Sequence, residues 1–221
     1  MDNVYPQIKI CGLTEVDAAL KCAELGADAI GCNFYPKSPR YISDDIARDI
    51  ATALPLSVSS VGVFVNFTFS DIMKKVEYCR LTAVQLHGQE SPELVKLLKK
   101  EKLKAYKALF VEAEPTLANA NAYDAIAFLI EQGKGNLPGG NARPWDWSKI
   151  RHFGERYPLI LAGGLTPENV IHAISLSEPD AVDVSSGVES VPGLKDMEKV
   201  AAFITAVSQT AIKEKHLKTI F

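Results

Sequence analysis

The sequence contains no long apolar run. No stretch of about 18 apolar residues, the length that a transmembrane helix needs, occurs in it. It also lacks the charged start followed by an apolar segment that is typical of a secretory signal peptide. Both absences predict a protein of the cytoplasm.

Cysteine is scarce and charge of one sign does not dominate. The 4 cysteines, at positions 11, 22, 32 and 79, show neither CxxC spacing nor the density of a secreted disulfide scaffold, so we expect four thiols. The formal net charge is −3, and basic residues are scattered apart from the segment "KEKHLK". Because no strong positive field results, we expect neither nucleic acid nor a membrane as a partner.

The sequence does contain short apolar, β-branched runs at regular intervals. In a chain of 221 residues with 47% apolar and 23% charged residues, they are typical of an ordinary globular protein. Most of them are apolar almost throughout, as parallel strands covered on both faces are. The eight candidates are "QIKICG", "ADAIGCNF", "SSVGVFVN", "AVQLHG", "KAYKALFV", "AIAFLIE", "PLILAGG" and "AVDVSSG".

The segments between these runs have helical patterns. In "TEVDAALKCAELG", Thr14 is a candidate N-cap and Gly26 a candidate stop. In "TPENVIHAIS", Thr166 is a candidate N-cap, and Pro167 then occupies the first helical position, where no backbone N–H is needed.

Eight alternating strand and helix units predict an α/β fold, a single (β/α)8 TIM barrel. An open doubly wound sheet would more naturally have five or six strands and a GxGxxG turn after the first, which "ICGLT" does not provide. We expect one domain over residues 1–221, with residues 210–221 as a possible C-terminal extension.

In such a barrel, chemistry takes place at the carboxyl ends of the strands and in the loops that follow them. The residues at these places are Cys11, Asn33 with the loop to Arg40, Asn66, His87, Glu131, Gly163 with Gly164, and the segment 183–187.

The loops after the seventh and eighth strands predict a phosphate site. Gly163 and Gly164 precede a helical segment, and Ser186 and Gly187 end a run of small residues. Glycine lets backbone N–H groups approach an anion, and a helix start adds a favourable dipole. The alternative is a tight strand-to-helix turn with no ligand.

Two further strand ends carry candidate reactive groups. Cys11 precedes Gly12 and a helix start, which would lower its pKa and make it a usable base or nucleophile; the alternative is a structural buried thiol. Arg40 follows Lys37 in "YPKSPRYIS", and its guanidinium could clamp a carboxylate through two hydrogen bonds; the alternative is a solvated loop charge.

His87 ends the fourth strand, where it could bind a ligand, make a polar contact or be a satisfied core histidine. The other histidines lie in helical segments or near the end of the sequence. No set of His, Asp and Glu at strand ends suggests a metal site, and we expect no metal.

Several motifs together resemble one family. They are "KICGLTEVDAA", "FYPKSPRYIS", "VGVFVN", "VQLHG", "LAGGLTPENV" and "VDVSSGVE" followed by "PGLKD". With these motifs in this order along the sequence, the chain resembles phosphoribosylanthranilate isomerase of tryptophan biosynthesis. The resemblance implies a cofactor-free barrel that converts N-(5-phosphoribosyl)anthranilate to 1-(2-carboxyphenylamino)-1-deoxyribulose 5-phosphate by an Amadori rearrangement.

The resemblance also implies roles for individual residues. Cys11 matches the general base, and Arg40 matches the arginine that holds the anthranilate carboxylate. Asp183 matches a polar contact to the substrate, and we count His87 among the substrate contacts as well. The loops after the seventh and eighth strands match the phosphate site.

The general acid is the point where the sequence departs from the family. The family has an aspartate at the end of the sixth strand, as in "LLD", whereas this chain has "FLIEQ". Counting back from Gly139 without a gap places that aspartate on Gln132, and one extra loop residue places it on Glu131. Only Glu131 has a proton to give, so we predict Glu131 as the acid.

Two other functions remain open at this stage. The barrel could isomerise or epimerise another phosphorylated sugar, because a fold alone does not determine function. It could also bind a phosphorylated metabolite without catalysis, given the altered sixth loop. The sequence favours neither a monomer nor a homodimer.

Overall fold

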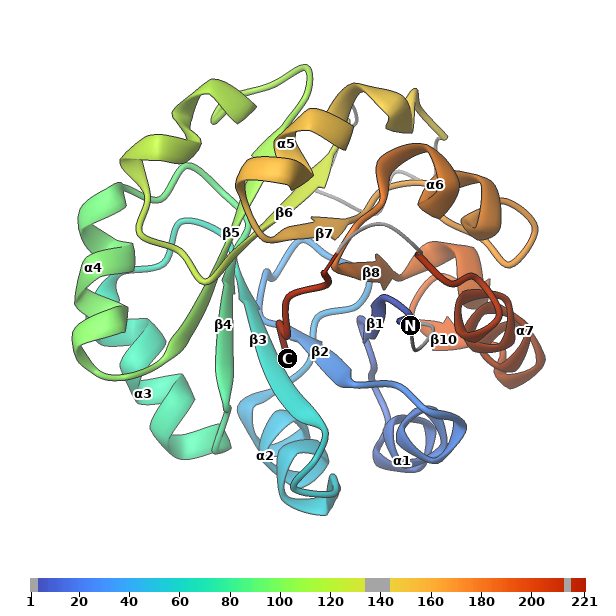
Figure 1. Ribbon diagram of the computed structural model, residues 1–221. Helices are drawn as coiled ribbons and strands as arrows, with labels where there is room; N and C mark the ends of the chain where they lie inside the picture. The colour runs from blue at the N-terminus through green and yellow to red at the C-terminus, as the bar shows by residue number, and fades with distance from the viewer. Residues whose placement is uncertain (1–3, 134–143, 213–215) are drawn as a thin grey trace.

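The computed structural model describes residues 4–133, 144–212 and 216–221, and shows a closed barrel of parallel strands in chain order (Figure 1). Pairing of Gln7 with Ala181 and Ile8 with Val182 closes the barrel between its first and last strands. The predicted fold class is confirmed. The strands are β1 (Gln7–Cys11), β2 (Ala29–Asn33), β3 (Ser59–Phe64), β4 (Ala83–Leu86), β5 (Lys104–Phe110), β6 (Ala127–Glu131), β7 (Leu159–Leu161) and β8 (Ala181–Val184).

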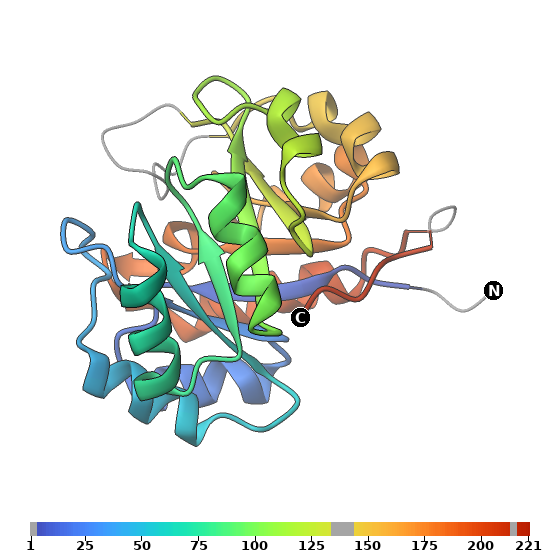
Figure 2. The same cartoon turned by 90° about the vertical axis from the view of Figure 1, so that its left-hand side faces the viewer.

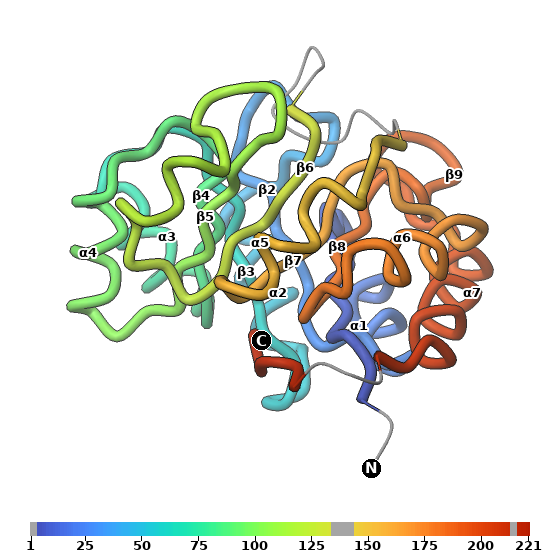
Figure 3. Tube along the Cα trace, turned by 45° about the horizontal axis from the view of Figure 1, so that its top comes forward, coloured from blue at the N-terminus to red at the C-terminus, as the bar shows by residue number. Residues whose placement is uncertain are grey.

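Helices surround the barrel, with α3 and α4 on the flank opposite α6 and α7 (Figures 1 and 3). A small antiparallel pair, β9 (Glu189–Val191) and β10 (Leu194–Lys195), follows β8. None of the described helices is long and apolar enough to cross a membrane. The α-helices are α1 (Val16–Leu25), α2 (Asp44–Ala53), α3 (Phe69–Cys79), α4 (Pro92–Lys100), α5 (Arg151–Arg156), α6 (Val170–Ser177) and α7 (Met197–Ser208), and the 3-10 helices are η1 (Leu117–Ala122), η2 (Trp147–Ile150) and η3 (Ser186–Val188).

The first helix ends as predicted but begins differently. Gly26 is its C-cap, with φ 111°, a conformation that glycine adopts without strain. The N-cap is Glu15, which makes no side-chain capping bond. The prediction of Thr14 as N-cap was wrong, because its Oγ1 donates to the carbonyl of Gly193 at 2.8 Å instead.

The start of α6 also differs from the prediction. Its N-cap is Asn169, not Thr166, and the helix begins at Val170 rather than at Pro167. The amide side chain of Asn169 explains the delay, because it accepts from Thr166 N–H and donates to the carbonyl of Gly164, both at 2.8 Å. These bonds hold the preceding residues in a turn.

The connection between β5 and β6 contains no α-helix, although the alternating pattern predicted one. The 3-10 helix η1 takes its place, and it is only 6 residues long. Asn119 closes its first turn by accepting from Thr116 N–H at 2.8 Å. A side chain that bonds its own backbone in this way competes with α-helix formation.

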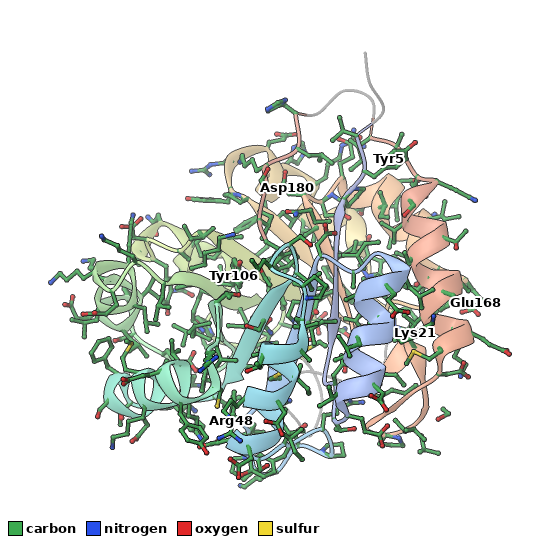
Figure 4. All side chains as sticks on the ribbon, turned by 90° about the horizontal axis from the view of Figure 1, so that it is seen from below. Tyr5, Lys21, Arg48, Tyr106, Glu168 and Asp180 are labelled. Atoms are coloured by element: carbon green, nitrogen blue, oxygen red, sulfur yellow. The ribbon has the colours of Figure 1, made fainter. Side chains whose placement is uncertain are left out.

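The last described residues cover the bottom of the barrel. Ile220 is 1% exposed and packs with side chains of the barrel interior, and its carbonyl accepts from Tyr106 Oη at 3.1 Å. Gln7 Oε1, at the start of β1, accepts from Ile220 N–H at 2.6 Å. Figure 2 marks this end of the chain, and Figure 4 labels Tyr106. The tail therefore closes the end of the barrel opposite the carboxyl ends of the strands.

Candidate active site

A pocket lies at the carboxyl ends of the strands and brings together most of the predicted site residues. Its lining comes from β1, β2, β3, β4, β6 and β8 and from the segments that follow β2, β3, β4, β7 and β8. Parallel strands of a closed barrel end on one face, which is why residues so distant in sequence meet here. The predicted residues that line it are Cys11, Asn33, Arg40, His87, Glu131, Gly163, Gly164, Asp183 and Ser186.

Cys11 is the last residue of β1, and its thiol lies beside the ammonium group of Lys9. A Cβ added to Gly31 on β2 would lie 2.7 Å from Cys11 Sγ and 3.1 Å from Lys9 Nζ. The two groups therefore share one small space, which Gly31 leaves open. Lys9 is fully buried and donates to Asp183 Oδ1 at 2.7 Å.

The prediction that a nearby helix start lowers the pKa of Cys11 was wrong. Burial raises the pKa of this thiol above its usual range, although the charge of Lys9 opposes the effect. The helix start cannot compensate, because α1 begins only at Val16. Burial would lower the pKa of Lys9, but Asp183 and Cys11 outweigh it and raise that pKa. The site thus holds a protonated lysine against a thiol.

Glu131 ends β6 inside the pocket and is only 6% exposed. Its Oε1 lies 3.2 Å from His87 Nε2, and His87 Nδ1 lies 2.9 Å from Gln85 Nε2. If the Gln85 amide donates to Nδ1, the histidine carries its hydrogen on Nε2, and Nε2–H donates a hydrogen bond to Oε1. This arrangement leaves the second oxygen of Glu131 as the one available to a ligand.

Gln132 does not line the pocket. It is half-buried, and its Nε2 donates to Glu112 Oε2 at 3.4 Å. The strand geometry explains the difference, because successive side chains point to opposite faces. Gly139, from which the family aspartate was counted, lies outside the described residues.

Gly163 brings β7 close to Glu131. Its φ of 83° is a backbone conformation that residues with a side chain rarely adopt. An added Cβ would lie 3.0 Å from Glu131 Cβ and 3.2 Å from Trp145 Nε1. Trp145 donates in turn to the carbonyl of Ala162 at 3.2 Å. The glycine therefore allows close packing that restricts the position of the carboxyl group.

Arg40 lines the pocket but already binds a carboxylate of the protein. Its Nε donates to Glu189 Oε1 at 2.8 Å and its Nη2 to Glu189 Oε2 at 2.7 Å. Among the described residues, none accepts a hydrogen bond from Nη1. Only the edge of the guanidinium that includes Nη1 is therefore available to a ligand.

The loops after β7 and β8 touch each other. Gly187 does not itself line the pocket, but a Cβ added to it would collide with the carbonyl of Leu165. The N–H groups of Gly164, Ser186 and Gly187 donate to no residue in the described part of the chain. Unpaired backbone donors gathered at one end of a pocket suit an anion.

No metal site accompanies these groups in the described ranges. Within residues 4–133, 144–212 and 216–221, no three or more His, Cys, Asp or Glu side chains are placed to hold a metal ion. The chemistry available to the described pocket is that of a thiol, two carboxyl groups, an imidazole and two cations.

Comparison with known proteins agrees with this geometry. Residues 8–206 match the model of the N-(5'-phosphoribosyl)anthranilate isomerase family. The chain belongs to this family. An isomerase of that name from Desulfatibacillum aliphaticivorans is 53% identical over 206 residues, which cover 93% of this chain and 94% of the relative.

Solved structures of the family have the same fold. The phosphoribosylanthranilate isomerase of Thermotoga maritima superposes with a TM-score of 0.85 at 42% identity, covering 92% of this chain and 98% of that one. A second structure of such an isomerase, with a TM-score of 0.81, 42% identity and the same coverage, is a complex with reduced 1-(o-carboxyphenylamino)-1-deoxyribulose 5-phosphate.

Four partners of the site residues were not predicted from the sequence. Lys9 and Gln85 each lie two positions before a predicted residue on a strand, so period-two alternation could have placed them on the same face as Cys11 and His87. Glu189 and Lys195 belong to the β9–β10 pair, which no strand-end argument includes. These two strands are only 3 and 2 residues long, too short for the sequence pattern to indicate them.

Proposed function

We propose that this protein catalyses the isomerisation of N-(5'-phosphoribosyl)anthranilate to 1-(o-carboxyphenylamino)-1-deoxyribulose 5-phosphate in tryptophan biosynthesis. The family membership supports the reaction. The observation that carries it for this chain is that Cys11, Glu131, Arg40 and the loops after β7 and β8 all line one pocket. The pocket thus offers an acid, a base, a cation and backbone N–H donors.

Glu131 acts as the acid in the first step. The furanose ring opens when its ring oxygen receives a proton as the bond from this oxygen to C1 breaks. The lone pair of the anthranilate nitrogen forms the Schiff base as that bond breaks. Glu131 suits this step because His87 lies 3.2 Å from its first oxygen, and the second oxygen stays available to the substrate.

Cys11 acts as the base in the second step. Its thiolate removes the proton from C2, and the electron pair moves into the C1–C2 bond and neutralises the Schiff base. The enolamine that results tautomerises to the keto product. Lys9 supports this role, because a cation beside Sγ stabilises the thiolate that must form.

The two ends of the substrate are both anionic and have separate partners. The anthranilate carboxylate binds the free edge of Arg40, and the phosphate binds the N–H groups of Gly163, Gly164, Ser186 and Gly187. Asp183 and His87 contact the sugar between them. Binding at both ends holds C1 and C2 between the acid and the base, which removes much of the entropic cost of reaction.

Turnover of freshly made N-(5'-phosphoribosyl)anthranilate by the wild-type protein tests the proposal. We expect loss of the anthranilate-type fluorescence at a rate proportional to enzyme concentration. The rate should be unchanged with EDTA present, since no step uses a metal. A protein that binds the compound without converting it would refute the isomerase proposal.

The pH dependence of kcat/KM tests the state of the Cys11 thiol. The reactive form needs a thiolate and a protonated carboxyl group, and carboxyl groups ordinarily titrate below thiols. As the pH rises between the two pKa values, the thiolate fraction increases as fast as the protonated carboxyl fraction falls, so the rate stays level. Because the pKa of Cys11 is raised above 9.0, we expect kcat/KM to fall only above about pH 9.

An alkaline fall that begins well below pH 9 in the same profile would mean that Lys9, rather than burial, determines the pKa of the thiol.

A further inference from the structure

We propose that Glu189 is a positioning residue for substrate recognition. It holds the guanidinium of Arg40 by one edge, so that the opposite edge faces the aromatic carboxylate of the substrate. This inference rests on the proposed function, because it concerns recognition of the anthranilate group. It adds to the site a residue that does not itself line the pocket.

The contact between the two side chains has the geometry of a bidentate pair. Arg40 donates through Nε and Nη2 to separate oxygens of Glu189, at 2.8 and 2.7 Å. Arg40 is 6% exposed and Glu189 8%, so both groups are largely removed from water. Two parallel bonds fix the plane of the guanidinium as well as its position.

Glu189 is itself fixed by two lysines. Lys195 donates to Glu189 Oε1 at 2.7 Å, and Lys199 donates to the carbonyl of Glu189 at 2.9 Å. Lys195 Nζ also donates to the carbonyl of Ser185 at 3.1 Å, and Ser185 Oγ donates to the carbonyl of Cys11 at 2.9 Å. The carboxylate is thus tied to the barrel strand that carries the base.

The rest of the Arg40 side chain is also constrained. A Cβ added to Gly12 would collide with Arg40 Cδ, so the arginine stem lies directly against this glycine. The backbone N–H of Arg40 donates to Ser38 Oγ at 3.1 Å. Because the aliphatic part of the side chain and two nitrogens of the guanidinium are all held in place, the guanidinium has little freedom to move.

A substrate carboxylate is not expected to displace Glu189 from the arginine. Burial would raise the pKa of Glu189, but hydrogen bonds from Arg40 and Lys195 outweigh it and keep that pKa below its usual range. Displacement would cost these bonds at a buried carboxylate. With Glu189 in place, two cations share one anion, and the cluster keeps a surplus positive charge for the substrate.

Two variants separate the position of the Glu189 carboxylate from its charge. Glu189→Gln removes the charge and turns one of its two acceptors into a donor. Glu189→Asp keeps the charge but withdraws the carboxylate by one methylene. If orientation of Arg40 is what matters, both variants should impair recognition of the aromatic carboxylate, whereas an effect of charge alone would leave Glu189→Asp similar to wild type.

The test measures dissociation constants for two ligands by calorimetry on the full chain. The ligands are reduced 1-(o-carboxyphenylamino)-1-deoxyribulose 5-phosphate and its counterpart without the carboxylate. For the first, we expect Glu189→Gln to raise Kd by about 10- to 100-fold, as loss of a charged hydrogen bond does. For the second, the change should stay below about threefold. In turnover, KM should rise while kcat changes little.

Glu198→Gln is the matched control, since it removes the same charge from an exposed glutamate in the first turn of α7. It should leave both dissociation constants unchanged. Equal weakening of both ligands by Glu189→Gln would indicate a general structural role and overturn the inference. Equal or tighter binding of the carboxylated ligand would overturn it too, because Glu189 would then compete with the substrate for Arg40.

Turnover by the wild type distinguishes failure of the proposed function from failure of the proposed role of Glu189. An inactive wild type would refute the proposed function. An active wild type with variants that do not discriminate between the ligands would refute only the role of Glu189.

Discussion

Cys11→Ala is expected to lower kcat by about 100- to 10,000-fold, the range typical of removing a general base. The thiol lies at the end of β1, beside Lys9 and within the pocket, and Asp183 already accepts from Lys9 at 2.7 Å. Alanine leaves no group at this place that could accept the C2 proton. Steady-state turnover of N-(5'-phosphoribosyl)anthranilate measures the loss.

Binding distinguishes this chemical loss from misfolding. Cys11→Ala should bind reduced 1-(o-carboxyphenylamino)-1-deoxyribulose 5-phosphate within about threefold of wild type, since the thiol contacts neither anionic end. Cys22→Ala is the control for loss of a buried thiol, because Cys22 lies in α1, in the layer between helices and barrel. It should retain turnover. If Cys11→Ala kept kcat within tenfold of wild type, another residue would have to be the base.

Glu131→Gln is expected to lower kcat by at least about 100-fold. The amide has nearly the shape of the carboxyl group and can still accept from His87, but it has no acidic proton for the ring oxygen. The substitution therefore removes the proton donor with little change in packing. Single-turnover measurement of ring opening and product formation would show the loss in the chemical step.

Gln132→Ala is the matched control at the neighbouring position. Gln132 lies outside the pocket and contacts Glu112, so this variant should keep kcat within about threefold of wild type. Glu131→Asp should recover part of the activity, because it retains the acid one methylene further from the substrate. An active Glu131→Gln together with an inactive Gln132→Ala would reverse the assignment of the acid.

The strands and their order could be predicted because their signal is local. Each strand is an apolar run covered on both faces, and the barrel places the ends of all strands on one side. This reasoning predicts that Cys11, His87, Glu131 and Asp183 lie at one end of the barrel, and all four line one pocket. The choice between Glu131 and Gln132 was harder, because a one-residue shift reverses the face on which a side chain lies.

The features that could not be predicted depend on contacts between distant segments. The raised pKa of Cys11 results from burial, and the helix start that the sequence suggests lies further along the chain, at Val16. The engagement of Arg40 by Glu189 joins residues 149 positions apart. Likewise, Asn169 delays α6 through bonds to its own turn, which a capping rule based on Thr166 and Pro167 does not anticipate.

A crystal structure of the wild-type protein with reduced 1-(o-carboxyphenylamino)-1-deoxyribulose 5-phosphate would test the central claim most directly. We expect the phosphate at the N–H of Gly164 and the aromatic carboxylate at Arg40 Nη1. Cys11 Sγ and the second oxygen of Glu131 should both lie within hydrogen-bonding reach of the sugar portion. A reversed ligand, or a Glu131 carboxyl group turned away from the sugar, would contradict the account.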